Sequence, residues 1–301
     1  MQTPLPTFKD PALEKQLIEQ GYITTPFFNH LEVQDLLDFY TSFTAEYTGN
    51  IDRASSHSSN IEYKRKVNAK IKDAYSNKVQ ELFIDPLIMG GAYVVKQPGS
   101  GVSHPHLDWS LVEEGPFRSC NIWIPLIDLT EENGVIEVLP ESHKLFTTYR
   151  GPNIPDRAND LQQFFWDTMI QLYLKAGTAL IYDHRLIHGS RDNLSAVLRP
   201  ATACAVTNLQ ANLRLYYMDE DSSQIEAFTG DNAEYLLSNS RFSKPTKMES
   251  LGIVDKSDHS QLTVEDYDFL NLDYPKLKPK EKEEPGFLSK ISALFKAGAS
   301  N

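Results

Sequence analysis

The sequence is poor in cysteine and has no long apolar run. Its 301 residues include two cysteines, Cys120 and Cys204, so we expect no disulfide framework of the kind that holds small secreted proteins together. No apolar run approaches the length of a membrane span, and residues 1–6 (MQTPLP) lack the charged and apolar regions of a signal peptide. We therefore expect a cytoplasmic protein without membrane contact.

Basic residues are outnumbered by acidic ones, 29 against 41, which gives a net charge of −12. Because nucleic-acid binding rests on clustered Lys and Arg side chains, we expect no nucleic-acid partner. One basic cluster does occur between residues 64 and 78, and apolar residues run through it at roughly helical spacing. We interpret it as the solvated face of a buried helix. The alternative is a patch that recognises an anionic group of a substrate.

The N-terminal part, up to about residue 85, has helical patterns. Gly21 ends the first helical segment, and Asn29 followed by Glu32 has the form of a capping box that starts another. The expected elements are a helix over 11–20, a strand over 22–25, a capped helix from 29 to about 46, a loop over 49–62 and a helix over 64–83.

From about residue 88 the pattern changes to short apolar strands separated by turn signals. Asn133-Gly134 is a strong signal for a hairpin turn. We expect strands at 93–96, 104–108, 120–126, 135–139, 178–183, 187–190 and 200–208. Helices followed by a run of antiparallel strands predict a mainly β protein with flanking helices and a jelly-roll core over about 88–210.

The remaining segments have weaker patterns. Residues 144–174 form an aromatic-rich excursion in which part of 159–174 is expected to be helical, and residues 213–275 show no motif. We expect one domain over 1–275, followed over 276–301 by a charged linker and a short amphipathic helix. That helix is expected to dock on its own domain or on a second copy of the chain. Reversible contact with a membrane surface or a partner is the alternative.

The chemistry is concentrated around residues 104–110 (HPHLDWS). In an extended strand His106 and Asp108 point to the same face, where an imidazole and a carboxylate can hold a divalent metal. A third ligand would complete the two-His, one-carboxylate face of non-haem iron sites.

His184 and His188 are both candidates for the third ligand, and strand alternation does not separate them because they lie four residues apart. Arg199, eleven residues after His188, favours His188. A planar guanidinium one strand away would hold the distal carboxylate of a 2-oxo acid.

These residues resemble the phytanoyl-CoA dioxygenase-like family of Fe(II)/2-oxoglutarate oxygenases. The resemblance extends to residues 123–134 (WIPLIDLTEENG), 140–143 (PESH) and 177–190 (GTALIYDHRLIHGS), and it covers about residues 20–208. One departure is Glu141, where many members have glycine. The family's fold is a double-stranded β-helix, the cupin-like form of the jelly roll.

The resemblance implies which residues act and with which cofactors. His106, Asp108 and His188 would bind Fe(II), Arg199 would bind the co-substrate 2-oxoglutarate, and O₂ would be the oxidant. Trp123 and Ser190 match positions that line the co-substrate pocket, and Asn121 and Tyr93 are expected to face the same cavity. Within the excursion, the candidate substrate contacts are Tyr149, Arg150, Arg157, Phe165 and Trp166.

A carboxylate at Asp108 favours hydroxylation, because related halogenases replace it with a small residue. The implied reaction is hydroxylation of an unactivated C–H bond, with release of succinate and CO₂. The substrate would be a small molecule or a biosynthetic intermediate borne on a carrier or peptide. Two alternatives are a non-catalytic relative that keeps the fold and an O₂-independent, cupin-like metal protein.

Overall fold

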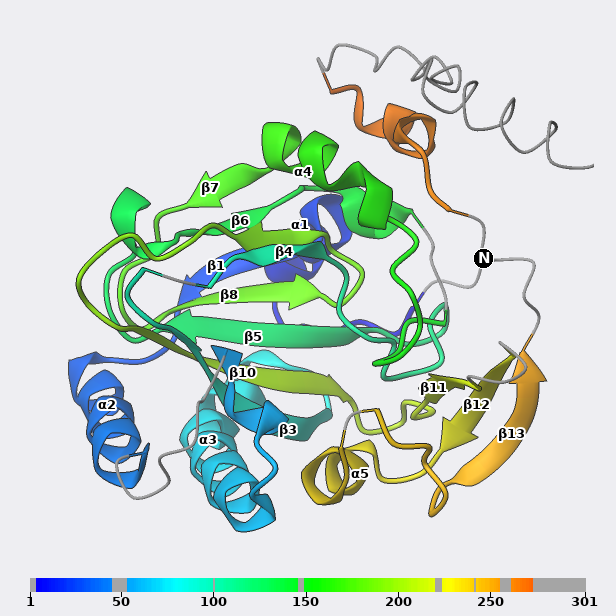
Figure 1. Cartoon of the computed structure of the whole chain (residues 1–301), viewed down its shortest axis with the longest axis horizontal. Helices are drawn as coiled ribbons and strands as arrows, with labels where there is room; N and C mark the ends of the chain where they lie inside the picture. The colour runs from blue at the N-terminus through cyan, green and yellow to red at the C-terminus, as the bar shows by residue number, and fades with distance from the viewer. Residues whose placement is uncertain are drawn as a thin grey trace, which may run out of the picture. The chain divides into compact units, whose positions relative to one another are not determined.

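Two antiparallel sheets with helices on one side organise this chain (Figure 1). The computed structural model describes residues 4–44, 53–99, 101–145, 149–219, 224–240, 242–254 and 261–272. The described residues as far as Leu270 belong to one compact unit. The predicted C-terminal linker and helix over 276–301 lie outside the described residues, so the predicted boundary at 275 remains a prediction.

The larger sheet has six strands in the order β1-β8-β5-β10-β3-β2. Every pairing in it is antiparallel. Its strands are β1 (Tyr22–Pro26), β2 (Arg53–Ala54), β3 (Pro86–Lys96), β5 (Ser119–Pro125), β8 (Thr178–Asp183) and β10 (Arg199–Asn208).

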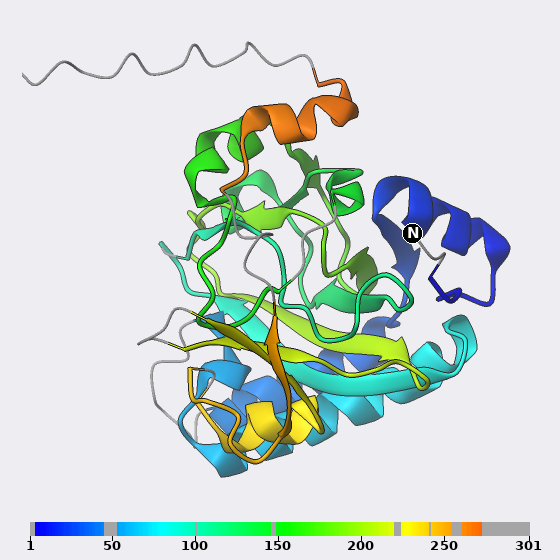
Figure 2. The same cartoon turned by 90° about the vertical axis from the view of Figure 1, so that its right-hand side faces the viewer.

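The smaller sheet has four strands in the order β4-β9-β6-β7 and lies over one face of the larger sheet (Figures 1 and 2). Its strands are β4 (Ser103–His106), β6 (Ile136–Val138), β7 (Ile170–Leu172) and β9 (His188–Ser190). The two facing sheets confirm the predicted jelly-roll core. Among the described residues, the strand pairings do not close them into a barrel.

Helices cover the opposite face of the six-stranded sheet. They are α2 (His30–Thr44) and α3 (Ile61–Leu82), while α1 (Pro11–Gln20) packs near β1 and the short α4 (Gln162–Thr168) lies beside the smaller sheet. The capping box forms as predicted, because Asn29 Oδ1 accepts from the Glu32 N–H and Glu32 Oε2 accepts from the Asn29 N–H. None of the described helices is both long and apolar enough to cross a membrane.

Alternate residues of the central strands separate two environments. Ile122 of β5 and Ile181 of β8 belong to the apolar core beneath α2 and α3. Their neighbours Trp123 and Tyr182 face the space between the sheets, in a second apolar cluster. This alternation decides which side chains can reach a site between the sheets.

Two local predictions were wrong. Asn133-Gly134 does not form a hairpin turn, because β5 pairs with β8 and β10 while β6 pairs with β7 and β9. The turn instead carries the chain from one sheet to the other. The predicted loop over 49–62 contains β2 and the 3₁₀ turn η1 (Ser55–His57).

The segment that showed no motif also has regular structure. It contains a three-stranded sheet of β11 (Leu215–Met218), β12 (Ile225–Thr229) and β13 (Glu249–Val254), and the short helix α5 (Asn232–Ser238).

Candidate metal centre

Three metal-competent side chains meet where β4 pairs with β9. His106, the last residue of β4, lies opposite His188, the first residue of β9, and their ring centroids are 4.3 Å apart. Asp108 follows β4, and its Oδ1 lies 3.8 Å from His106 Nε2 and 3.9 Å from His188 Nε2. One ligand atom from each residue lies within 4.8 Å of the other two, so the strand pairing assembles a two-His, one-carboxylate group.

Hydrogen bonds aim these ligand atoms at one another. The Nδ1 atoms of His106 and His188 lie 2.7 Å and 3.0 Å from the carbonyl oxygens of His104 and Leu186. In the tautomer whose Nδ1 donates to those carbonyls, Nε2 of each ring carries the lone pair that can ligate a metal. His184 is held separately, with its Nδ1 2.7 Å from the Ser119 hydroxyl oxygen.

The other carboxylate oxygen of Asp108 is occupied by donors from the six-stranded sheet. Oδ2 accepts from Asn121 Nδ2 at 3.2 Å and from the Tyr182 hydroxyl at 3.1 Å. The same hydroxyl accepts a bond from Asn121 at 2.9 Å. These contacts fix the carboxylate plane and leave Oδ1 facing the imidazoles.

The electrostatics favour the forms that bind a cation. Burial would raise the pKa of Asp108, but His188, His184, His106 and the Asn121 bond hold it well below its usual value. Burial lowers the pKa of His188 to about 4. The centre therefore presents a carboxylate together with a neutral His188 imidazole at neutral pH, which are the forms that ligate metals.

The triad opens into a cavity of about 500 Å³ between the sheets, here called the main cavity. Arg199 lines it and is 2% exposed. The guanidinium lies over the Trp123 ring at 5.3 Å and donates to the Gly134 carbonyl at 3.0 Å. Among the described residues no carboxylate pairs with it, and its Nε has no hydrogen-bond acceptor. Burial lowers the pKa of Arg199 to about 9, so it stays charged at neutral pH.

Gly134 provides that carbonyl from a conformation that favours glycine. Its φ is +78°, and a Cβ there would lie 2.6 Å from the Arg191 carbonyl oxygen. Glycine at 134 is therefore needed for the crossing between sheets and for the position of the carbonyl that Arg199 contacts.

Of the other predicted pocket residues, the structure places Trp123, Ser190 and Asn121 on the main cavity and Tyr93 elsewhere. Tyr93 points to the helix side of β3, where its hydroxyl donates to the Leu36 carbonyl at 2.8 Å. The prediction for Tyr93 was wrong because strand alternation directs Ala92 and Val94, rather than residue 93, into the cavity.

The predicted substrate contacts divide into two groups. Tyr149, Arg150 and Arg157 line a separate hollow of about 220 Å³ that reaches His106. Arg150 is also paired with Glu114 and donates from Nε to the Asp108 carbonyl at 2.7 Å, so it supports the centre as well as bordering the hollow.

Phe165 and Trp166, also predicted as substrate contacts, are not brought to either cavity. Phe165 is fully buried and packs edge-on against Tyr267. Trp166 stacks with Arg191, whose guanidinium lies 4.6 Å from the indole centroid. Both side chains pack α4 against its surroundings, and neither lines the main cavity or the hollow at His106.

Two side chains at the centre were not predicted. Tyr182 contacts Asp108 and also lies 3.0 Å from His188 Nε2 through its hydroxyl. Lys96 is buried at the cavity wall and donates to the carbonyls of Gly101, Ser190 and Arg191. Parity within β8 places Tyr182 on the face opposite Ile181, but no local signal shows that this face meets His188, which lies on β9 of the other sheet.

Comparison with known proteins places this geometry in context. A family model described as phytanoyl-CoA dioxygenase (PhyH) matches residues 27–201. The chain is 32% identical over 136 residues to a phytanoyl-CoA dioxygenase of Arabidopsis thaliana, covering 42% of this chain and 48% of that protein. It is 30% identical over 139 residues to phytanoyl-CoA dioxygenase domain-containing protein 1 of Danio rerio, with the same coverage of 42% and 48%. The matches span about half the length of these curated relatives.

Solved structures share the fold at lower identity. The non-heme alpha ketoglutarate dependent carbocyclase SnoK from nogalamycin biosynthesis aligns with a TM-score of 0.51 and 19% identity, covering 68% of this chain and 86% of that one. The epimerase SnoN, solved with Fe³⁺, alpha ketoglutarate and nogalamycin RO, aligns with a TM-score of 0.51 and 15% identity, covering 82% of this chain and 98% of that one. These likenesses support the jelly-roll architecture.

Proposed function

Because the chain belongs to the phytanoyl-CoA dioxygenase family, we propose that it is an Fe(II)- and 2-oxoglutarate-dependent oxygenase. One observation carries the proposal. The main cavity holds three convergent metal-ligand atoms and a buried arginine without an acidic partner among the described residues. A metal alone would explain the triad, but it would not explain an unpaired guanidinium in the same cavity.

The residues present fit both groups. His106 Nε2, Asp108 Oδ1 and His188 Nε2 would hold Fe(II) as a facial set and leave coordination positions open. The orphan Nε of Arg199, which has no acceptor, would donate to the distal carboxylate of 2-oxoglutarate, a planar anion suited to a guanidinium. Bound Fe(II) would supply O₂ activation coupled to decarboxylation of the 2-oxo acid.

The rest of the cavity would position these groups. Trp123 stacks under the Arg199 guanidinium, and Ser190 lines the wall beside it. Asn121 and Tyr182 hold the second oxygen of Asp108, so the carboxylate remains a one-oxygen ligand. The walls also limit access of water to the reacting atoms.

The proposed net reaction joins a C–H substrate, 2-oxoglutarate and O₂ to give an alcohol, succinate and CO₂. One oxygen atom enters the alcohol and the other enters succinate, so the atoms balance. The substrate class we propose is a small molecule or an intermediate borne on a carrier or peptide. The carboxylate at Asp108 supports hydroxylation, because it fills the position that a halide would need.

The test is an anaerobic titration of the full-length protein with Fe(II) and 2-oxoglutarate, following the visible charge-transfer absorption of the chelate. We expect the band in wild type and its loss in His188→Ala. His30→Ala is the matched control, because His30 is an exposed residue at the start of α2, and we expect it to keep the band.

The alternatives give different results. Absence of the band in wild type at saturating ligand would refute the oxygenase proposal and favour a non-catalytic relative. A band without succinate formation in air, across a panel of substrates, would favour an O₂-independent metal protein.

A further inference from the structure

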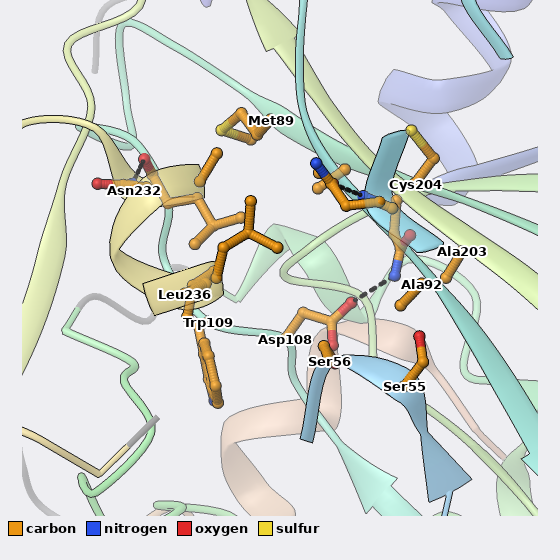
Figure 3. A pocket seen from close by; sticks show the side chains of 18 of the residues that line it. Ser55, Ser56, Met89, Ala92, Asp108, Trp109, Ala203, Cys204, Asn232 and Leu236 are labelled. Atoms are coloured by element: carbon orange, nitrogen blue, oxygen red, sulfur yellow. Dashed lines mark hydrogen bonds between the residues drawn. The ribbon is translucent and has the colours of Figure 1, made fainter. Parts of the chain in front are cut away.

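A second cavity adjoins the metal centre at Asp108. This α5 pocket, about 270 Å³ in volume, is lined by residues of α3, α5, β3 and β10, and it shares Asp108 and Asn121 with the main cavity. In Figure 3, Asn232 and Leu236 of α5 lie across the pocket from Ala203, and Asp108 lies between the two sides. Ligand pockets usually measure about 300–1,000 Å³, so this one suits a compact molecule.

The wall of the α5 pocket is largely apolar. Small side chains of the sheet and larger ones of α5 and the neighbouring loops supply most of it, and these are Met89, Ala92, Leu111, Ala203, Ala205, Leu236 and Leu237. Among the described residues, Asp108 is the one acidic residue that lines it. A ligand with an apolar body is therefore favoured, and in the described part of the chain the rest of the wall offers no carboxylate to attract a cation.

Two hydrogen-bond donors of α3 line the same pocket. Lys64 and Asn68 are four residues apart on α3 and therefore lie on one face of the helix. Lys64 is 5% exposed, and its ammonium donates to the carbonyls of Leu236 and Asn239 at 2.9 Å and 3.1 Å. An ammonium has three N–H donors, so one has no acceptor among the described residues.

Asn68 has its amide orientation fixed. Its Oδ1 accepts from the Gly91 N–H at 2.9 Å, which leaves the Nδ2 donors without a hydrogen-bond acceptor among the described residues. Burial lowers the pKa of Lys64, as expected for an ammonium that no carboxylate neutralises in this part of the structure. An ammonium and an amide N–H₂ on one helix face form a pair suited to an anion.

A third polar group points to a ligand independently. Asn232 is 1% exposed and lines the α5 pocket. Its Nδ2 donates to two backbone carbonyls, but its Oδ1 accepts no hydrogen bond from the described residues. A buried acceptor without a donor is costly, and a hydroxyl or amine on a bound ligand would satisfy it.

We propose that the α5 pocket is the substrate site and that it selects compact, largely apolar carboxylates held by Lys64 and Asn68, with the apolar body directed toward Asp108. This inference rests on the proposed oxygenase function.

The proposal assigns a role to one residue of the basic cluster between residues 64 and 78. Arg65, Lys66, Lys70 and Lys78 pair with surface carboxylates instead, so the solvated-face interpretation holds for them and the anion-binding alternative applies to Lys64.

The test measures binding of octanoate, with octan-1-ol as the uncharged probe, by calorimetry on the full-length protein loaded with Mn(II) and 2-oxoglutarate. We expect octanoate to bind at least about tenfold more tightly than octanol, as a charge-assisted hydrogen bond allows. Lys64→Met should remove that preference. Lys66→Met is the matched control, because Lys66 lies on the same helix and pairs with Glu62, and it should bind octanoate like wild type.

A second variant covers the case that Lys64→Met does not fold. Asn68→Asp keeps an oxygen to accept the Gly91 N–H bond but replaces the amide donors with a carboxylate oxygen. We expect it to weaken octanoate binding by at least about tenfold while octanol binding stays the same.

The chelate absorption with Fe(II), recorded on the same preparations, separates the possible failures. If the chelate forms but octanoate does not bind, or binds equally to wild type and Asn68→Asp, the inference is wrong and the oxygenase proposal stands. If the chelate does not form in wild type, both are wrong.

Discussion

The two faces of the six-stranded sheet are built from alternate residues of the same strands, but their compositions differ. On the face toward α2 and α3, Ile122, Ile181 and Val206 are apolar and belong to one buried cluster. On the face toward the smaller sheet, Asn121 and Arg199 line the main cavity. A shift of one residue in any strand would exchange the two sets.

The difference shows in the hydrogen bonds of particular side chains. On the helix face the Tyr75 hydroxyl lies 2.7 Å from the Thr202 hydroxyl, and the Tyr93 hydroxyl donates to the Leu36 carbonyl at 2.8 Å. On the cavity face Arg199 retains a donor without an acceptor. Substitutions on the helix face should therefore change stability, and substitutions on the cavity face should change ligand binding.

The largest effect is expected from Ile122→Ala on the helix face. Ile122 is fully buried, and loss of its side chain should lower the free energy of unfolding by about 2–5 kcal/mol. The measurement is urea denaturation. The Fe(II)/2-oxoglutarate chelate should still form below the unfolding transition, and its loss from folded protein would contradict the separation of the two faces.

Arg199→Met on the cavity face should weaken ligand binding without lowering stability. We expect the affinity for 2-oxoglutarate to fall about 100-fold, because a charge-assisted, two-point contact is lost. The unfolding free energy of the ligand-free protein should not fall, since a desolvated charge without an acidic partner is removed. Calorimetry and urea denaturation of the same variant test both halves. A large loss of stability with unchanged affinity would indicate that Arg199 is structural.

Tyr182→Phe should give a smaller effect, which is confined to the affinity for the metal. Its hydroxyl bonds Asp108 and lies beside His188, and loss of such a supporting contact should weaken Mn(II) binding by about tenfold. Tyr75→Phe is the matched control on the helix face. It should cost about 1 kcal/mol of stability and leave Mn(II) affinity unchanged. Equal Mn(II) affinities of wild type and Tyr182→Phe would show that the hydroxyl does not support the centre.

The smallest effect is expected from Tyr93→Phe. Because the Tyr93 hydroxyl donates to Leu36 on the helix side, its removal should cost about 1 kcal/mol of unfolding free energy. Affinity for 2-oxoglutarate should not change. A tenfold loss of that affinity would indicate that Tyr93 faces the main cavity, as predicted from the sequence.

The sequence alone was enough to identify the jelly-roll class and the family. Short apolar strands separated by turn signals are a local pattern, as is the capping box at Asn29. The His-x-Asp motif also depends on local geometry, since two residues on one strand share a face wherever the strand lies. Arg199 could be paired with His188 because eleven residues leave room for a turn and a return, although the two residues lie on strands of different sheets, β10 and β9.

The tertiary structure determined which strands, helices and side chains face one another. The Asn133-Gly134 turn looked like a hairpin because its residues fit one, but the partners of β5 and β6 lie in different sheets. Tyr93 and Phe165 were misplaced because a strand's parity and a helix's packing face depend on neighbours distant in sequence. The α5 pocket could not be predicted, since Lys64 and Asn232 are far apart in the chain and meet only when α5 packs against α3. Periodicity fixes which residues share a face, whereas burial of apolar surface between distant segments determines what that face meets.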